Sequence, residues 1–126
     1  FGTNFGMTFQ LIDDAIDYSS NKKILGKNTG DDFKEGKITL PIILAYGRSN
    51  DKEKKFWERT ISDLNQNDGD FEMALEIINK YQCIEDTLTR ANHFSNVAVD
   101  SVDIFKDNIY KEKLVSLVTK SVSRIY

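Results

Sequence analysis

Three aspartates near the start of the chain have a spacing that could hold a metal ion. Asp13, Asp14 and Asp17 follow Gln10 in a segment whose apolar residues recur every three or four positions. In a helix this spacing gathers the three carboxylates within one turn. Because like charges this close repel one another, a hard divalent cation with oxygen ligands would relieve the repulsion. The spacing therefore predicts a Mg²⁺ site at the three aspartates.

The segment that follows predicts a phosphorylated ligand beside the metal. Lys27 and Lys37 alternate there with Gly26, Gly30 and Gly36, so that cations and exposed backbone N–H groups are available to a diphosphate. Mg²⁺ usually keeps several waters and takes one or two carboxylates together with substrate phosphates. Taken singly, each feature also fits a solvated acidic face or a solvated lysine, and this alternative stays open.

Helices must position these groups, because the sequence offers no convincing strand. Apolar spacing predicts a first helix through about Tyr18, with a buried face that includes Phe5 and Phe9. Residues 19–37 are polar and glycine-rich and are predicted to form a long binding loop. Thr39 and Pro41 then begin a short helix that should end near Arg48. The predicted fold class is all-α.

Further helices are predicted by apolar residues at helical intervals. The first should be capped by Asp51 or a neighbour, carry Trp57, Ile61 and Leu64 on its inward side, and end before residues 65–70. The longest is expected over residues 84–105, where no glycine or proline interrupts the pattern and Phe105 is an inward position. The remaining predicted helices cover residues 71–78 and 114–125.

The composition is that of one soluble domain. A chain of 126 residues with 40% hydrophobic content can bury a single core. Its net charge of −3 gives no general attraction to nucleic acid or to an anionic membrane. No window reaches the roughly 18 consecutive apolar residues of a membrane span, and no signal segment is visible, so a cytoplasmic protein is expected.

Cysteine and histidine each occur once in the sequence, and this excludes two kinds of site. Cys83 is the only cysteine, so an internal disulfide is excluded, and a buried apolar role is expected for it. His93 is the only histidine, which excludes a multi-histidine metal site. The chain begins with Phe1 inside a helical pattern, and for this reason it is expected to be a fragment.

Two sequence runs carry a family resemblance. Residues 6–18 read GMTFQLIDDAIDY and residues 25–41 read LGKNTGDDFKEGKITLP. In this order they resemble the trans-type polyprenyl diphosphate synthases, particularly the bacterial octaprenyl type. The motif-rich part covers residues 1–44. The resemblance implies that residues 1–126 form one helical unit, the C-terminal portion of the isoprenoid synthase helical bundle.

The resemblance also implies roles for individual residues. Asp13, Asp14 and Asp17 would be the second aspartate-rich motif, holding Mg²⁺ that bridges to the allylic diphosphate. Gln10 would bind the same diphosphate. Lys27 would contact it as well and would act with Asp13 and Asp14 in catalysis.

Three further residues are implied at the edge of this site. Asp32 and Lys37 would line the diphosphate site or a water-mediated metal shell. Arg124 would lie near the basic C-terminal end that the family places over the isopentenyl diphosphate site.

The implied reaction is head-to-tail prenyl transfer from an allylic diphosphate to isopentenyl diphosphate. The full-length protein would be a homodimer that makes an octaprenyl chain for a quinone. The family's first aspartate-rich motif is absent here, so this chain alone is expected to be inactive. The alternatives are a noncatalytic partner subunit and a helical interaction module whose acidic helix merely faces solvent.

Overall fold

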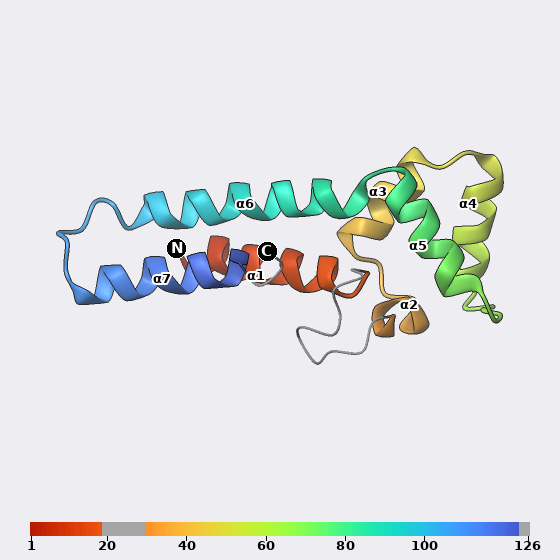
Figure 1. Ribbon diagram of the computed structural model, residues 1–126, viewed down its shortest axis with the longest axis horizontal. Helices are drawn as coiled ribbons and strands as arrows, with labels where there is room; N and C mark the ends of the chain where they lie inside the picture. Colours follow the sequence, from red (N-terminus) through yellow and green to blue (C-terminus); the bar gives the residue numbers. More distant parts are fainter. Residues whose placement is uncertain (19–29, 124–126) are drawn as a thin grey trace. The chain divides into compact units, whose positions relative to one another are not determined.

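The computed structural model describes residues 1–18 and 30–123, and every regular element in these residues is helical (Figure 1). This confirms the all-α prediction. In chain order the elements are α1 (Gly2–Ile16), α2 (Asp31–Glu35), α3 (Leu40–Arg48), α4 (Asp51–Trp57), the π-helical turn η2 (Glu58–Ser62), α5 (Asp70–Lys80), α6 (Cys83–Ser101) and α7 (Ile109–Ser123). Among the described residues, no helix combines the length and apolar character that a membrane crossing requires.

The chain divides into two compact units. The first contains residues 1–13 and the part of the chain from residue 87 onward, and the second is Asp14–Asp86. The first unit therefore holds most of α1 together with most of α6 and all of α7, while α2 to α5 belong to the second.

In the first unit, α6 and α7 are long helices joined by residues 102–108 (Figure 1). The hydroxyl of Thr8 on α1 donates to the carbonyl oxygen of Ala91 on α6 at 3.4 Å. The buried apolar residues of this unit are Leu11, Ile12, Ala91, Ala98, Val102 and Val118. Among the described helices α6 is the longest, as predicted, but it ends at Ser101. Phe105 lies beyond its end with 60% of its surface exposed, so the inward position predicted for it is wrong.

The core of the second unit lies where α3 packs against α4 and α5. Its buried members are Tyr18, Phe33, Ile42, Ala45, Trp57, Ile61, Ala74, Ile77, Ile78 and Cys83. The indole N–H of Trp57 donates to Ser49 Oγ at 3.1 Å, and this hydroxyl donates to the carbonyl of Ala45 at 2.6 Å. A satisfied N–H lets the large ring be fully buried. The predicted burial of Trp57, Ile61 and Cys83 is confirmed.

Local signals placed two helix starts correctly. Thr39 is the N-cap of α3 and Pro41 lies in its first turn, where a missing N–H costs nothing. Asn50 caps α4 through a reciprocal pair of hydrogen bonds with Glu53. The helix widens into the π-helical turn and ends before Leu64, which has φ 53° and is 54% exposed. The inward position predicted for Leu64 is therefore wrong.

The predicted loop over residues 19–37 contains a short helix. Residues 19–29 lie outside the described part of the chain, but Asp31–Glu35 form α2 between two left-handed glycines, Gly30 (φ 91°) and Gly36 (φ 68°). Five residues cannot sustain a helix by themselves. Phe33 makes α2 stable because its side chain is 2% exposed and belongs to the core of the second unit.

Candidate functional site

The aspartates of the predicted metal site are more buried than a solvated acidic face would be. Asp13 and Asp14 lie in the last turn of α1, and Asp17 follows directly after it. Asp13 is half-buried, Asp14 is 5% exposed and Asp17 is fully buried, whereas Phe9, predicted to be inward, is 45% exposed. Burying a carboxylate is costly unless it is hydrogen-bonded or paired with a positive charge. Asp14 and Asp17 therefore do not belong to a solvated acidic face.

Asp17 is bonded to the start of α2. Its Oδ2 atom accepts the backbone N–H of Asp32 at 3.0 Å, and its carbonyl oxygen accepts the N–H of Gly30 at 3.2 Å. Side chain and backbone of one residue thus both receive N–H groups from the beginning of the short helix. These bonds hold Asp17 against the start of α2 within the second unit.

The short helix places two further predicted residues beside one another. Lys37 donates its backbone N–H to the carbonyl of Asp32 at 2.9 Å, and its Nζ lies 4.0 Å from Asp32 Oδ1. The side chain of Lys37 is 47% exposed and that of Asp32 is 14% exposed. The structure therefore brings together Asp17, Asp32 and Lys37. The side chain of Lys37 is open to a ligand, because about half of it is exposed and its contact with Asp32 is long.

Sequence reasoning missed Tyr18 as a member of this region. Its side chain is 2% exposed, and within the described part of the chain its hydroxyl has no hydrogen-bond partner. Burial raises the pKa of Tyr18 well above its usual range, and the carboxylates of Asp17, Asp32 and Asp14 raise it further. The hydroxyl is therefore protonated and lies near three carboxylates. The only sequence signal was its place directly after the third aspartate.

The remaining predicted residues are Gln10, Lys27 and Arg124. Lys27 and Arg124 lie outside the described residues. Gln10 is exposed on the part of α1 that belongs to the first unit. In residues 1–18 and 30–123, no three His, Cys, Asp or Glu side chains are arranged as a ready-made metal cage. The chemistry of the donors nevertheless suits Mg²⁺, because carboxylates such as those of Asp13 and Asp14 are the ligands that this ion takes when phosphates complete its shell.

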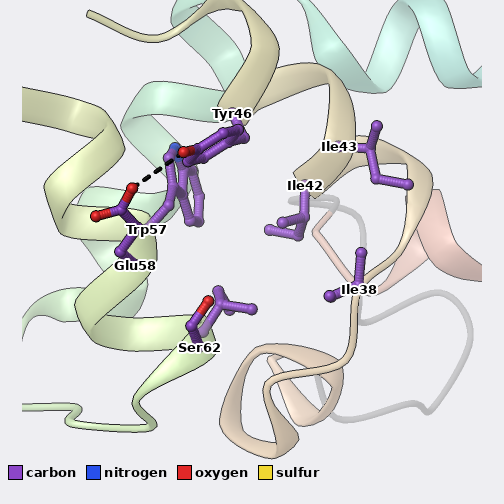
Figure 2. A pocket seen from close by; sticks show the side chains of 8 residues that line it. Ile38, Ile42, Ile43, Tyr46, Trp57, Glu58 and Ser62 are labelled. Atoms are coloured by element: carbon purple, nitrogen blue, oxygen red, sulfur yellow. Dashed lines mark hydrogen bonds between the residues drawn. The ribbon is translucent and has the colours of Figure 1, made fainter. Parts of the chain in front are cut away.

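A second concavity in the second unit has a different character. A pocket of about 430 Å³ lies between α3 and the α4–η2 segment (Figure 2). Its walls are mostly aliphatic and aromatic, and its one acidic residue, Glu58, accepts a hydrogen bond from the Tyr46 hydroxyl at 3.0 Å. The lining residues are Ile38, Ile42, Ile43, Tyr46, Trp57, Glu58, Ile61 and Ser62. Such a pocket suits an apolar group and offers no binding site for a diphosphate.

The chain is similar to known proteins along its whole length. The family model for polyprenyl synthetase matches residues 1–78. The octaprenyl diphosphate synthase of Haemophilus influenzae is 36% identical over 126 residues, which is all of this chain and 38% of that protein. The octaprenyl diphosphate synthase of Escherichia coli is 33% identical over 124 residues, or 98% of this chain and 38% of that protein.

Solved structures of a polyprenyl synthase and a decaprenyl diphosphate synthase are also similar to this chain. A polyprenyl synthase from Caulobacter crescentus, crystallised with calcium and isoprenyl diphosphate, has 43% sequence identity and a TM-score of 0.88 over 97% of this chain and 37% of its own. A decaprenyl diphosphate synthase from Rhodobacter capsulatus has 34% identity and a TM-score of 0.91 over 99% of this chain and 38% of its own. The chain thus spans about 38% of the length of the relatives it matches.

Proposed function

Because the chain belongs to the polyprenyl synthetase family, we propose that it supplies one part of the Mg²⁺ and diphosphate site of a polyprenyl diphosphate synthase. The observation that carries the proposal is the cluster at the start of α2. There a buried aspartate segment, Asp32 and the half-exposed cation of Lys37 are held together by hydrogen bonds and one ion pair. Carboxylates for a metal and a cation for phosphate oxygens would then serve the same ligand.

The residues of the chain would bind and orient the diphosphate group. Asp13 and Asp14 would hold Mg²⁺, which when bound neutralises charge on a departing diphosphate. Lys27 and Lys37 would contribute positive charge at the same group, and Gln10 would donate a hydrogen bond to it. The metal-binding roles that the sequence predicts for Asp17 and Asp32 stay predictions, as does the role of Arg124 at the isopentenyl diphosphate.

The proposed substrates follow from the relatives. The Caulobacter protein was crystallised with calcium and isoprenyl diphosphate, which supports a divalent cation and a prenyl diphosphate as ligands. We propose head-to-tail addition of isopentenyl diphosphate to an allylic diphosphate. The octaprenyl relatives support a long-chain product, which would serve as a quinone side chain. A homodimer in the cytoplasm is part of the same proposal.

This chain alone is expected to bind diphosphate without completing the reaction. It matches 38% of the length of its relatives, and the first aspartate-rich motif implied by the family resemblance is not in its sequence. A polyprenyl diphosphate synthase needs charge stabilisation around the whole leaving group. Activity would therefore require the part of the protein that carries that motif.

Calorimetric titration of inorganic diphosphate into the chain, with and without Mg²⁺, tests the proposal. Binding is expected to need Mg²⁺ and to weaken by about tenfold or more in Asp13→Ala and Lys27→Ala, because each removes a charged group at the ligand. Asp51→Ala is the matched control, since Asp51 is an exposed carboxylate in the first turn of α4. Equal binding by all variants, or binding independent of Mg²⁺, would contradict the proposal and favour a helical interaction module.

A further inference from the structure

The three aspartates of the motif differ in what surrounds them. Asp13 is half-buried, while Asp17 is fully buried. One carboxylate oxygen of Asp17 already receives the backbone N–H of Asp32. A carboxylate that accepts a buried backbone N–H stabilises the backbone that donates it. The three aspartates are therefore not equivalent, although the sequence presents them as one motif.

The structure around α2 explains what the bond to Asp17 achieves. The far end of the helix is fixed by Gly36, whose N–H donates to Phe33, and by Gln66, whose side-chain amide donates to the Phe33 carbonyl at 2.7 Å. The start of the helix depends on Asp17, because Gly30 provides no side-chain cap. Among the described residues, the start of α2 is tied to the end of α1 by two bonds, and Asp17 accepts both.

The aromatic side chains around Gly30 leave little room for the start of α2 to lie elsewhere. A Cβ atom added to Gly30 would lie 3.1 Å from the ring of Phe71. The same ring packs against Tyr18 at 6.3 Å and against Phe33 at 5.7 Å between centroids. The position of α2 therefore depends on Asp17 and on the small size of Gly30.

We propose that Asp17 is a positioning residue, which holds the start of α2 so that Asp32 and Lys37 are presented to the diphosphate. This inference rests on the proposed function. The contribution of Asp17 comes through its hydrogen bond to the backbone of Asp32, and the metal would be held by Asp13 and Asp14. An uncharged acceptor at position 17 should therefore be enough, whereas a metal ligand would need the negative charge.

Two substitutions at position 17 separate these roles without any ligand present. Hydrogen exchange of residues 30–36 in metal-free chain should stay within about threefold of the parent in Asp17→Asn, because an asparagine side chain accepts the same N–H bond. It should become about tenfold faster in Asp17→Ala, which has no acceptor. Asp31→Asn is the control for charge, because Asp31 is an exposed neighbour on α2.

Diphosphate titration in Mg²⁺ provides the second measurement. Asp17→Asn should bind within about threefold of the parent, whereas Asp17→Ala should lose about tenfold. Gly30→Ala removes no oxygen ligand, but its Cβ meets Phe71 at φ 91°, so it should also lose about tenfold. If Asp17→Ala does not fold, Asp17→Asn and Gly30→Ala still decide between the two roles.

The outcomes are distinct. Asp17→Asn that loses binding as Asp13→Asn does, with hydrogen exchange of α2 unchanged, would overturn the proposal and make Asp17 a metal ligand. Binding unaffected by Gly30→Ala would overturn it as well. Absence of Mg²⁺-dependent binding in the parent chain would contradict the proposed function instead, while the exchange measurement would still test the contact between Asp17 and α2.

Discussion

Charged side chains are hydrogen-bonded in two regions of the second unit, but their partners differ. Between the α4–η2 segment and α5, two carboxylates meet cations: Arg59 binds Asp70 through two bonds of 2.8 and 3.0 Å, and Lys80 binds Glu53 at 3.0 Å. At the start of α2, Asp17 receives a backbone N–H. The charge pairs between the α4–η2 segment and α5 stabilise the fold, whereas the bond from Asp17 to the backbone of Asp32 positions a helix that carries Asp32 and leads to Lys37.

The difference predicts which property each region controls. Substitutions between α4 and α5 should lower the free energy of unfolding and leave diphosphate affinity unchanged. Asp17→Ala should weaken diphosphate binding, whereas Asp17→Asn, which keeps the acceptor for the Asp32 N–H, should not. The three experiments below test this division, beginning with the position where the two regions meet.

Gly36→Ala should have the largest effect. It should lower both the free energy of unfolding and diphosphate affinity, because Gly36 lies where the two regions meet. The Cβ atom would lie 2.5 Å from Leu64 Cδ2 and 2.9 Å from the carbonyl oxygen of Ile61, at a φ of 68°. A left-handed alanine with such contacts should lower the free energy of unfolding by about 2–3 kcal/mol, measured by urea denaturation. Because Gly36 ends α2, diphosphate affinity should fall too.

The matched control is Gly47→Ala. Apart from the glycine, its two chain neighbours and the nearby backbone of its own helix, no atom lies within 4 Å of a Cβ added to Gly47, so the substitution should raise the free energy of unfolding by about 0.5–1 kcal/mol. A Gly36→Ala chain as stable as the parent would show that α2 is not fixed by its C-terminal glycine.

Asp70→Ala should lower stability and spare ligand binding. Its side chain, 12% exposed, binds Arg59 twice and accepts the N–H of Asn67 at 2.7 Å. Losing these bonds should cost about 1–2 kcal/mol in urea denaturation, because Arg59 can turn partly to solvent. Asp68→Ala, at an exposed neighbour, should stay within about 0.5 kcal/mol. Weaker diphosphate binding by Asp70→Ala would contradict the division between the regions.

Local sequence signals predicted most of the helices. The apolar spacing of α1 and α5, and Thr39 with Pro41 before α3, act between residues that are near in the chain. Helix α2 was missed because five residues between two glycines show no periodicity, and its stability comes from Phe33 in a distant core. Leu64 and Phe105 were placed inward because the apolar spacing continues after the helix has ended.

The candidate site was predicted in composition and only partly in arrangement. The spacing of Asp13, Asp14 and Asp17 singled out the acidic segment, and the following lysines and glycines indicated an anion. The sequence could not show that Asp17 is buried and bonded to Asp32, because that contact joins residues 15 positions apart through a tertiary fold. Tyr18 was missed because its burial also depends on residues far away in the sequence, such as Phe71.

Glu53→Gln should have the smallest effect. The pH dependence of this effect tests whether the charge of Glu53 stabilises the contacts between α4 and α5. The Tyr81 hydroxyl at 2.6 Å, the Asn50 N–H and Lys80 lower the pKa of Glu53 from 4.5 to about 2, against the opposing effect of burial. A folded pKa below the unfolded one stabilises the chain above pH 4.5, and this stability is lost as pH falls from 4.5 to 2.

Urea denaturation at pH 7 should therefore show Glu53→Gln to be about 1 kcal/mol less stable than the parent, with the difference shrinking toward pH 2.5. Tyr81→Phe removes the donor with the largest influence on Glu53, so the pKa followed by NMR should move back toward 4.5. A difference between Glu53→Gln and the parent that is the same at pH 7 and pH 2.5 would mean that the hydrogen bonds of Glu53 do not depend on its charge. The contacts between α4 and α5 would then stabilise the fold by packing, and the contrast with Asp17 would no longer be one of charge pairing.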